Sequence, residues 1–159
     1  MRRWLTAPVA ALTIVIVLFA FKDTIREHRA RAFARAAWNG EIGKMKLLRL
    51  LGADPQEPSY GVVRPMIGAA ENGHIAVVAY LLDSGVNVNQ HDKFGLTALI
   101  AVTETRHIEE TRRIEMVKYL LSRGADVNAI SEGYTALALA LKNNNAELVQ
   151  LLREHGAKK

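Results

Sequence analysis

Four leucine-rich segments divide the chain at nearly regular intervals, and each ends in a glycine. They read KLLRLLG, AYLLDSG, KYLLSRG and QLLREHG, with the glycines at positions 52, 85, 124 and 156. A glycine followed two residues later by Asp or Asn, as at the first three, is typical of a helix end and a turn. A second short apolar segment precedes each one, at residues 31–40, 64–73, 96–105 and 134–143. The pattern therefore predicts four units of helix, tight turn, helix and glycine stop.

The second and third units are close copies of each other. Residues 75–89 (IAVVAYLLDSGVNVN) and 114–128 (IEMVKYLLSRGADVN) are identical at eight of fifteen positions. A single helix pair is too small to bury its apolar face, whereas stacked pairs form a continuous core and need the same residues at their contacts. The predicted core positions of the second helices are Leu47, Val78, Val117 and Val149, with the leucine pairs that follow them.

The residues that open and close each unit carry a family signature. The first helices open with residues 64–67 (RPMI), 97–100 (TALI) and 135–138 (TALA), and Gly95 and Gly133 stand two residues before the two threonines. The second helices close with Gly-Ala-Asp or a variant of it. This pattern resembles the ankyrin repeat. The chain departs from it in lacking the histidine of the opening motif, whose positions are Ala34, Ile67, Ile100 and Ala138.

The resemblance covers about residues 31–159 and implies an all-α fold. We expect an ankyrin-repeat solenoid of about four stacked helix–turn–helix units, with repeats at about 31–57, 58–90, 91–129 and 130–159, preceded by one N-terminal apolar (transmembrane) helix. The last repeat should cap the array with a final helix at about 146–155 and a polar outer face. Because the missing histidines remove hydrogen bonds between repeats, we expect a modestly stable array. We also expect the repeat domain to be monomeric.

The N-terminus is a separate apolar element. The run from Trp4 to Phe21 holds 18 residues without a charge. As a helix it would span about 27 Å, close to the ~30 Å hydrocarbon core of a bilayer. The predicted domains are a transmembrane anchor or signal-anchor at 1–21, a basic linker at 22–32 and the ankyrin repeat domain at 33–159. A cleaved signal peptide, with Arg2 and Arg3 as its basic start, and a buried soluble helix remain alternatives.

The positive charge of the chain is concentrated beside that apolar run. Residues 1–32 hold six basic and two acidic residues, a net of +4, and the rest of the chain holds 15 basic and 14 acidic residues, a net of +1. This distribution favours an anionic bilayer surface over nucleic acid, so we expect no nucleic-acid partner. The basic residues after the run place the repeats on the cytoplasmic side by the positive-inside rule. The pair Arg2-Arg3 supports the exported side instead.

The third unit contains an insertion. The glycine spacing widens to 39 between Gly85 and Gly124, and six extra residues lie within 103–114 (TETRHIEETRRI). This stretch is either a solvated extension with i,i+4 pairs such as Glu109 with Arg113, or a loop that is specific for one partner. His107, with Glu104 and Glu110 three residues away, lacks the signature of a metal site.

Nothing in the sequence indicates catalysis. The chain has no cysteine and neither an HExxH motif nor a phosphate-binding glycine loop. We therefore predict that the protein is not an enzyme and uses no cofactor and no metal. The predicted function is a non-catalytic protein–protein interaction module, tethered to a membrane through residues 4–21 and binding a protein partner; an exported soluble binding protein is the alternative.

The resemblance also implies where a partner binds, namely at the connector tips and the exposed ends of the first helices. Phe94 and Tyr134 are candidate anchors, because exposed aromatic side chains often dominate interfaces; alternatively, they lean on the adjacent repeat. The candidate partner-binding residues are His91, Lys93, Phe94, Leu96, Glu104, Thr105, Ser131, Glu132, Tyr134, Lys142 and Asn143, with Ser59, Tyr60, Glu71 and Asn72 at matching positions of the second repeat.

Overall fold

The computed structural model describes residues 6–57 and 64–158, with side chains from residue 21 onward. Within these residues the chain forms eight α-helices and no extended strand, only two isolated bridges, His91 with Thr97 and Ser131 with Tyr134. The helices are α1 (Thr6–Trp38), α2 (Ile42–Leu50), α3 (Pro65–Glu71), α4 (Ile75–Asp83), α5 (Ala98–Glu104), α6 (Glu110–Ser122), α7 (Ala136–Lys142) and α8 (Ala146–Glu154).

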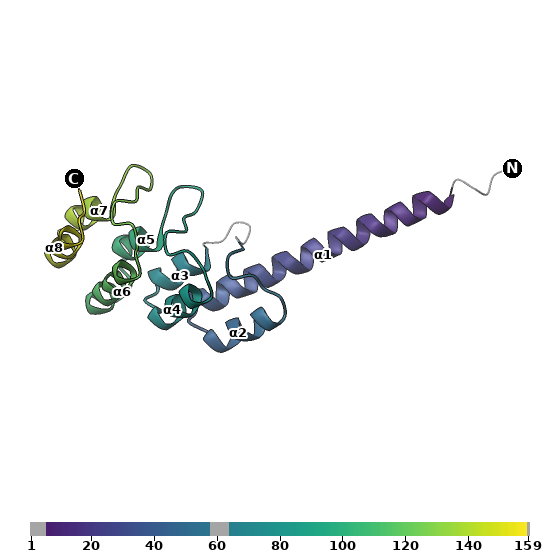
Figure 1. The fold of residues 1–159 in the computed structure, drawn as a ribbon, viewed down its shortest axis with the longest axis horizontal. Coiled ribbons are helices and arrows are strands. Elements are labelled where there is room, and N and C mark those ends of the chain that lie inside the picture. Colours follow the sequence, from purple (N-terminus) through teal and green to yellow (C-terminus); the bar gives the residue numbers. More distant parts are fainter. Residues whose placement is uncertain (1–5, 58–63, 159) are drawn as a thin grey trace.

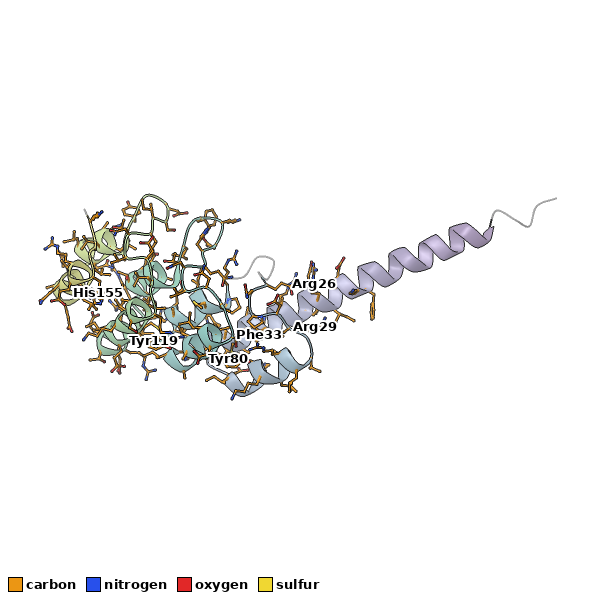
Figure 2. All side chains as sticks on the ribbon, viewed as in Figure 1. Arg26, Arg29, Phe33, Tyr80, Tyr119 and His155 are labelled. Atoms are coloured by element: carbon orange, nitrogen blue, oxygen red, sulfur yellow. The ribbon has the colours of Figure 1, made fainter. Side chains whose placement is uncertain are left out.

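The helices stack as four antiparallel pairs. Each first helix packs on the next, in the order α1, α3, α5 and α7, and each pairs with the second helix that follows it. Figure 1 shows the resulting array, with α7 and α8 at one end and α1 running out of the other. Phe33 of α1 is fully buried where this helix joins the array (Figure 2). The prediction of an all-α repeat solenoid is confirmed.

The glycine stops end the second helices as the sequence predicts. Gly52, Gly85, Gly124 and Gly156 all have φ between +85° and +88°, a conformation that only glycine adopts without strain. The residue after each glycine donates its backbone N–H to a carbonyl five residues back, for example Val86 to Leu81 at 3.1 Å. This bond closes the helix end and sends the chain into the connector.

Asparagine side chains link the connectors of neighbouring repeats. Asn89 Nδ2 donates to the Gly124 carbonyl at 3.2 Å, and its Oδ1 accepts from the Asp126 N–H at 2.7 Å. Asn128 makes the same two contacts with Gly156 and Lys158, at 3.2 and 2.8 Å. These bonds join the repeats at the connectors, although the opening histidines are absent.

Three predicted core residues of the first repeat are wrong: Leu47 and the leucine pair that follows it, Leu50 and Leu51, are exposed. Val78 and Val117 are fully buried and Val149 is partly buried, but Leu47 is exposed. Met45, which stands seven residues before its glycine as those valines do before theirs, fills the core position instead. The first repeat therefore uses a different apolar residue at the conserved spacing, and Leu47 lies on the outer side of α2.

The basic segment at 22–32 is helical and continuous with the first repeat. Helix α1 runs from Thr6 to Trp38 without a break, because residues 9–39 contain no Gly or Pro and are rich in alanine and other good helix formers. Its last part, with Phe33, Ala36 and Ala37 fully buried, is the first helix of repeat one. The segment predicted as a linker thus connects the N-terminus to the array as a rod.

The described residues contain no helix that is both long enough and apolar enough to cross a bilayer. The predicted span from Trp4 to Phe21 falls almost entirely outside the described side chains.

The insertion forms a loop and also lengthens the helix that follows it. A loop at 105–109 follows α5, and α6 has 13 residues where α4 and α8 have nine. The expected pair of Glu109 with Arg113 is wrong: the buried Arg113 guanidinium contacts Glu110 at 3.0 Å. The loop places Glu109 immediately before the helix, so that only Glu110 is on the first turn beside Arg113.

Candidate partner-binding surface

The tip of the third repeat is a turn held by one aspartate. Asp92 Oδ1 accepts hydrogen bonds from the N–H groups of Phe94 and Leu96, at 2.8 and 2.9 Å. The Gly95 N–H donates to the Asp92 carbonyl at 3.2 Å, and Gly95 has a φ of +84°. Asp favours such turns because its side chain accepts hydrogen bonds from nearby backbone N–H groups, and Gly favours them because it adopts positive φ without strain. The turn fixes the backbone that presents Phe94 to solvent.

The tip of the fourth repeat is a two-residue hairpin turn. Ser131 and Tyr134 exchange backbone hydrogen bonds of 3.0 and 2.8 Å around Glu132 and Gly133. Both central residues have positive φ, +48° and +84°, as in the turns that match the twist of paired strands. This geometry orients Tyr134 outward, directly before the helix-capping Thr135.

The two tips are fastened to each other and to the helices below them. Ser131 Oγ donates to the Phe94 carbonyl at 3.1 Å, and a Cβ added to Gly95 would lie 2.6 Å from the Ile130 carbonyl oxygen. Below the third-repeat tip, Thr97 Oγ1 accepts from the Ile100 N–H at 3.3 Å, as an N-cap of α5. The tips therefore form one rigid edge.

Three large apolar side chains project from this edge. Phe94, Ile130 and Tyr134 are 55%, 63% and 47% exposed. Lys93 Nζ lies 4.8 Å from the centre of the Phe94 ring, and Lys142 Nζ lies 5.3 Å from that of Tyr134. Such cation–π contacts hold the rings while leaving much of their faces open. We call the set formed by Phe94, Ile130, Tyr134, Lys93 and Lys142 the tip surface.

Ile130 was missed by the sequence analysis. It belongs to the connector of the fourth repeat (residues 126–133, DVNAISEG). It is the largest apolar side chain there, and this was the signal that could have identified it.

The predicted binding residues divide into exposed and buried groups. Ser131 and Thr105 are buried; Ser131 ties the tips together, and Thr105 Oγ1 lies 2.6 Å from His107 Nδ1. Their positions indicate structural roles. Ser59 and Tyr60 lie outside the described residues. The exposed candidates are His91, Lys93, Phe94, Glu104, Glu132, Tyr134 and Lys142, and the partly buried ones are Leu96, Asn143, Glu71 and Asn72.

The candidates at the other ends of the first helices form a separate group with the insertion. Glu104 ends α5 and Lys142 ends α7. Arg106 donates from Nη2 to Asn143 Oδ1, and Asn145 Nδ2 donates to Glu110 Oε1. The insertion therefore bridges the third and fourth repeats. Lys142 also reaches the tip of the fourth repeat, because its Nζ lies 5.3 Å from the centre of the Tyr134 ring, whereas Asn143 contacts the insertion through Arg106.

One carboxyl near the insertion is perturbed. Burial raises the pKa of Glu71, the nearby Glu104 carboxylate raises it further, and His107 opposes this rise. In the described part of the chain, no three His, Cys, Asp or Glu side chains are grouped so that they could hold a metal ion.

Comparison with known proteins agrees with this architecture. A family model described as ankyrin repeats (3 copies) matches residues 33–130 and 66–159. The chain belongs to the ankyrin repeat family.

Several curated proteins are similar to it. An ankyrin repeat and KH domain-containing protein of Caenorhabditis briggsae is 31% identical over 135 residues, covering 84% of this chain and 5% of that protein. A putative ankyrin repeat protein of fowlpox virus is 35% identical over 120 residues, covering 71% of this chain and 33% of that protein. An L-asparaginase of Dirofilaria immitis is 29% identical over 150 residues, covering 77% of this chain and 25% of that protein. The chain thus spans a third or less of the length of these relatives.

Proposed function

We propose that this protein is a non-catalytic module that binds a protein partner through the tip surface. Ankyrin repeats indicate protein–protein interaction, and the observation that supports this surface is the rigid edge carrying Phe94, Ile130 and Tyr134. Exposed aromatic side chains on a fixed backbone lose little conformational freedom on binding and serve as anchors. Lys93 and Lys142 beside the rings favour a partner segment with apolar side chains flanked by carboxylates.

The test compares capture of a protein partner by the full chain and by a variant with Phe94→Ala, Ile130→Ala and Tyr134→Ala. A matched control with Lys118→Ala and Gln150→Ala changes exposed residues on the second helices. Loss of about 2 kcal/mol at an anchor corresponds to roughly 30-fold weaker binding. We expect at least this loss for the triple variant and none for the control. Equal affinity of the triple variant and the unchanged chain, for the same partner, would exclude the tip surface.

We further propose that the run from Trp4 to Phe21 tethers the module to a membrane. The support is its 18-residue length without a charge and the continuous helix that leads from it into the first repeat. A tether raises the effective concentration of the module for partners in the same membrane. The repeats lie on the cytoplasmic side in this proposal, because the basic residues follow the span.

Alkaline carbonate extraction tests the tether. We expect the chain to stay in the membrane pellet, whereas release into the supernatant would exclude it. A mature protein that begins after residue 21 by N-terminal sequencing would instead identify an exported soluble binding protein.

A further inference from the structure

The N-terminal end of the array exposes apolar side chains where a repeat array usually presents a polar cap. Leu47, Leu50 and Leu51 of repeat one are 57%, 85% and 58% exposed. They stand at i, i+3 and i+4, so they lie on one side of α2. At the opposite end of the array, α8 exposes Gln150 and Glu154 instead. Stacked arrays need polar outer faces to remain soluble, which indicates that something covers α2.

Helix α1 extends this apolar surface. Phe21 and Ile25 are exposed on α1 and stand eight and four residues before Arg29, on roughly the same side of the helix. The Arg29 guanidinium donates to the Leu51 carbonyl, which places the end of α2 beside that side of α1. Figure 2 shows Arg26 and Arg29 where α1 leaves the array. We call Phe21, Ile25, Leu47, Leu50 and Leu51 the basal face.

The surroundings of the basal face are strongly basic. Residues 22–49 hold eight basic and three acidic residues, a net of +5, whereas residues 50–159 hold 11 basic and 13 acidic residues, a net of −2. Some of these charges are paired, as Arg26 is with Glu57 at 2.9 Å and Lys44 with Glu41 at 3.1 Å. The excess remains positive and is confined to this end of the chain.

The positive charge around the basal face favours one binding partner over another. A second copy of the chain would bring its own net charge of +5 against the same charge, and like charges oppose association. An anionic surface is complementary to the face, and an apolar surface flanked by lysine and arginine is the pattern of segments that lie in the bilayer interface.

The end of α2 lies a short distance along α1 from the proposed membrane span, which brings the basal face near an anionic bilayer surface. Arg29 follows Phe21 by eight residues, or about 12 Å of helix, and the headgroup layer on each side of a bilayer is roughly 5–7 Å thick. A single spanning helix is commonly tilted by about 20°, which lowers one of its sides towards the bilayer. The end of α2 is therefore within reach of the headgroups when residues 4–21 span the membrane.

We propose that Leu47, Leu50 and Leu51 insert into the interface of an anionic bilayer, with Lys44 and Lys46 against its headgroups. This inference rests on the proposed tether. The contact covers the exposed leucines and sets the array close to the membrane. It also leaves the tip surface, which lies on other repeats, open to a partner.

Single cysteine labels test the contact, since the chain has no cysteine of its own. The full chain with Leu50→Cys carries an environment-sensitive fluorophore and is reconstituted into vesicles of phosphatidylcholine, with or without 30 mol% phosphatidylglycerol. Glu154→Cys is the matched control, because Glu154 also stands two residues before the glycine stop of its repeat and is exposed. Spin-labelled lipids should quench the Leu50 label at least threefold more strongly in anionic than in neutral vesicles and leave the Glu154 label unchanged. Adding Lys44→Gln and Lys46→Gln should reduce quenching to the neutral-vesicle level.

Flotation and carbonate extraction of the same samples separate the two proposals. If the chain remains in the vesicles but its Leu50 label is quenched no more than the Glu154 label, the basal contact is excluded and the tether stands. If the chain does not float with the vesicles, both proposals fail. Disulfide-linked dimers of unlabelled Leu50→Cys chains would assign the basal face to a second copy and overturn the lipid contact. Shielding of the Leu50 label only on addition of an acidic protein would also overturn the lipid contact.

Discussion

Gly95 at the third-repeat tip provides a direct test of how closely the tips pack. Its φ of +84° is unfavourable for any residue with a Cβ, at a cost of about 1–2 kcal/mol for alanine. In addition, a Cβ there would lie 2.6 Å from the Ile130 carbonyl oxygen and 3.5 Å from Ser131 Cα, which are backbone atoms of the next tip. Relieving that overlap requires a shift of one tip, at about 1–3 kcal/mol more.

Gly133 is a matched control for this effect. It has the same φ of +84° but no heavy atom within 4 Å of an added Cβ. Gly133→Ala should therefore lower the free energy of unfolding by about 1–2 kcal/mol, and Gly95→Ala by about 2–5 kcal/mol. The difference between the two variants measures the contact between the tips and not the backbone conformation.

Urea unfolding of the full chain in mild detergent measures both variants. With a slope of about 2 kcal/mol/M for a chain of this size, a difference of about 2 kcal/mol moves the midpoint by about 1 M. Circular dichroism and Trp fluorescence should give the same midpoint, which checks that the array unfolds as one unit. Equal midpoints for Gly95→Ala and Gly133→Ala would refute the close contact between the tips.

Two further predictions concern the core and one carboxyl. Met45→Ala should lower the free energy of unfolding by about 2–5 kcal/mol, because it leaves a cavity between α1 and α2. Leu47→Ala should change the free energy of unfolding by less than about 0.5 kcal/mol. Similar losses for both variants in urea unfolding would contradict the assignment of Met45 to the core. Because burial raises the pKa of Glu71, the folded chain binds this proton more readily than the unfolded chain, so ionisation of Glu71 lowers stability as pH rises through the raised pKa. Glu71→Gln should therefore stabilise the protein at pH 7 but not at pH 4, and a difference between the variant and the unchanged chain that is the same at both values would rule this out.

The repeats were predictable from the sequence because their signals are local. The backbone at a helix end adopts positive φ and so favours a glycine, such as Gly85 or Gly124. The threonine caps bond to N–H groups within four residues. The exposure of Phe94 and Tyr134 also followed from their place in the connectors. These features depend on the backbone around each residue and little on the rest of the molecule.

The remaining features depend on packing between repeats. Thr105 and Ser131 look like surface residues in the sequence, yet contacts across the insertion and between the tips bury them. Leu47 was misassigned because the first repeat places a methionine at the spacing where the other repeats have valine. The pairing of Arg113 with Glu110 depends on where the loop ends and α6 begins, which the charge pattern of residues 103–114 does not specify.

The unbroken course of α1 has a mechanical consequence for the whole molecule. A continuous helix has no hinge. An interaction that fixes the orientation of the residues before Phe21 therefore also fixes the direction in which Phe94 and Tyr134 point. Each residue added to or removed from segment 22–32 would turn the array by about 100° about the helix axis while moving it only about 1.5 Å. The number of residues in this segment therefore sets the rotational orientation of the array about the helix axis. A flexible connection of the same length would leave that orientation undefined.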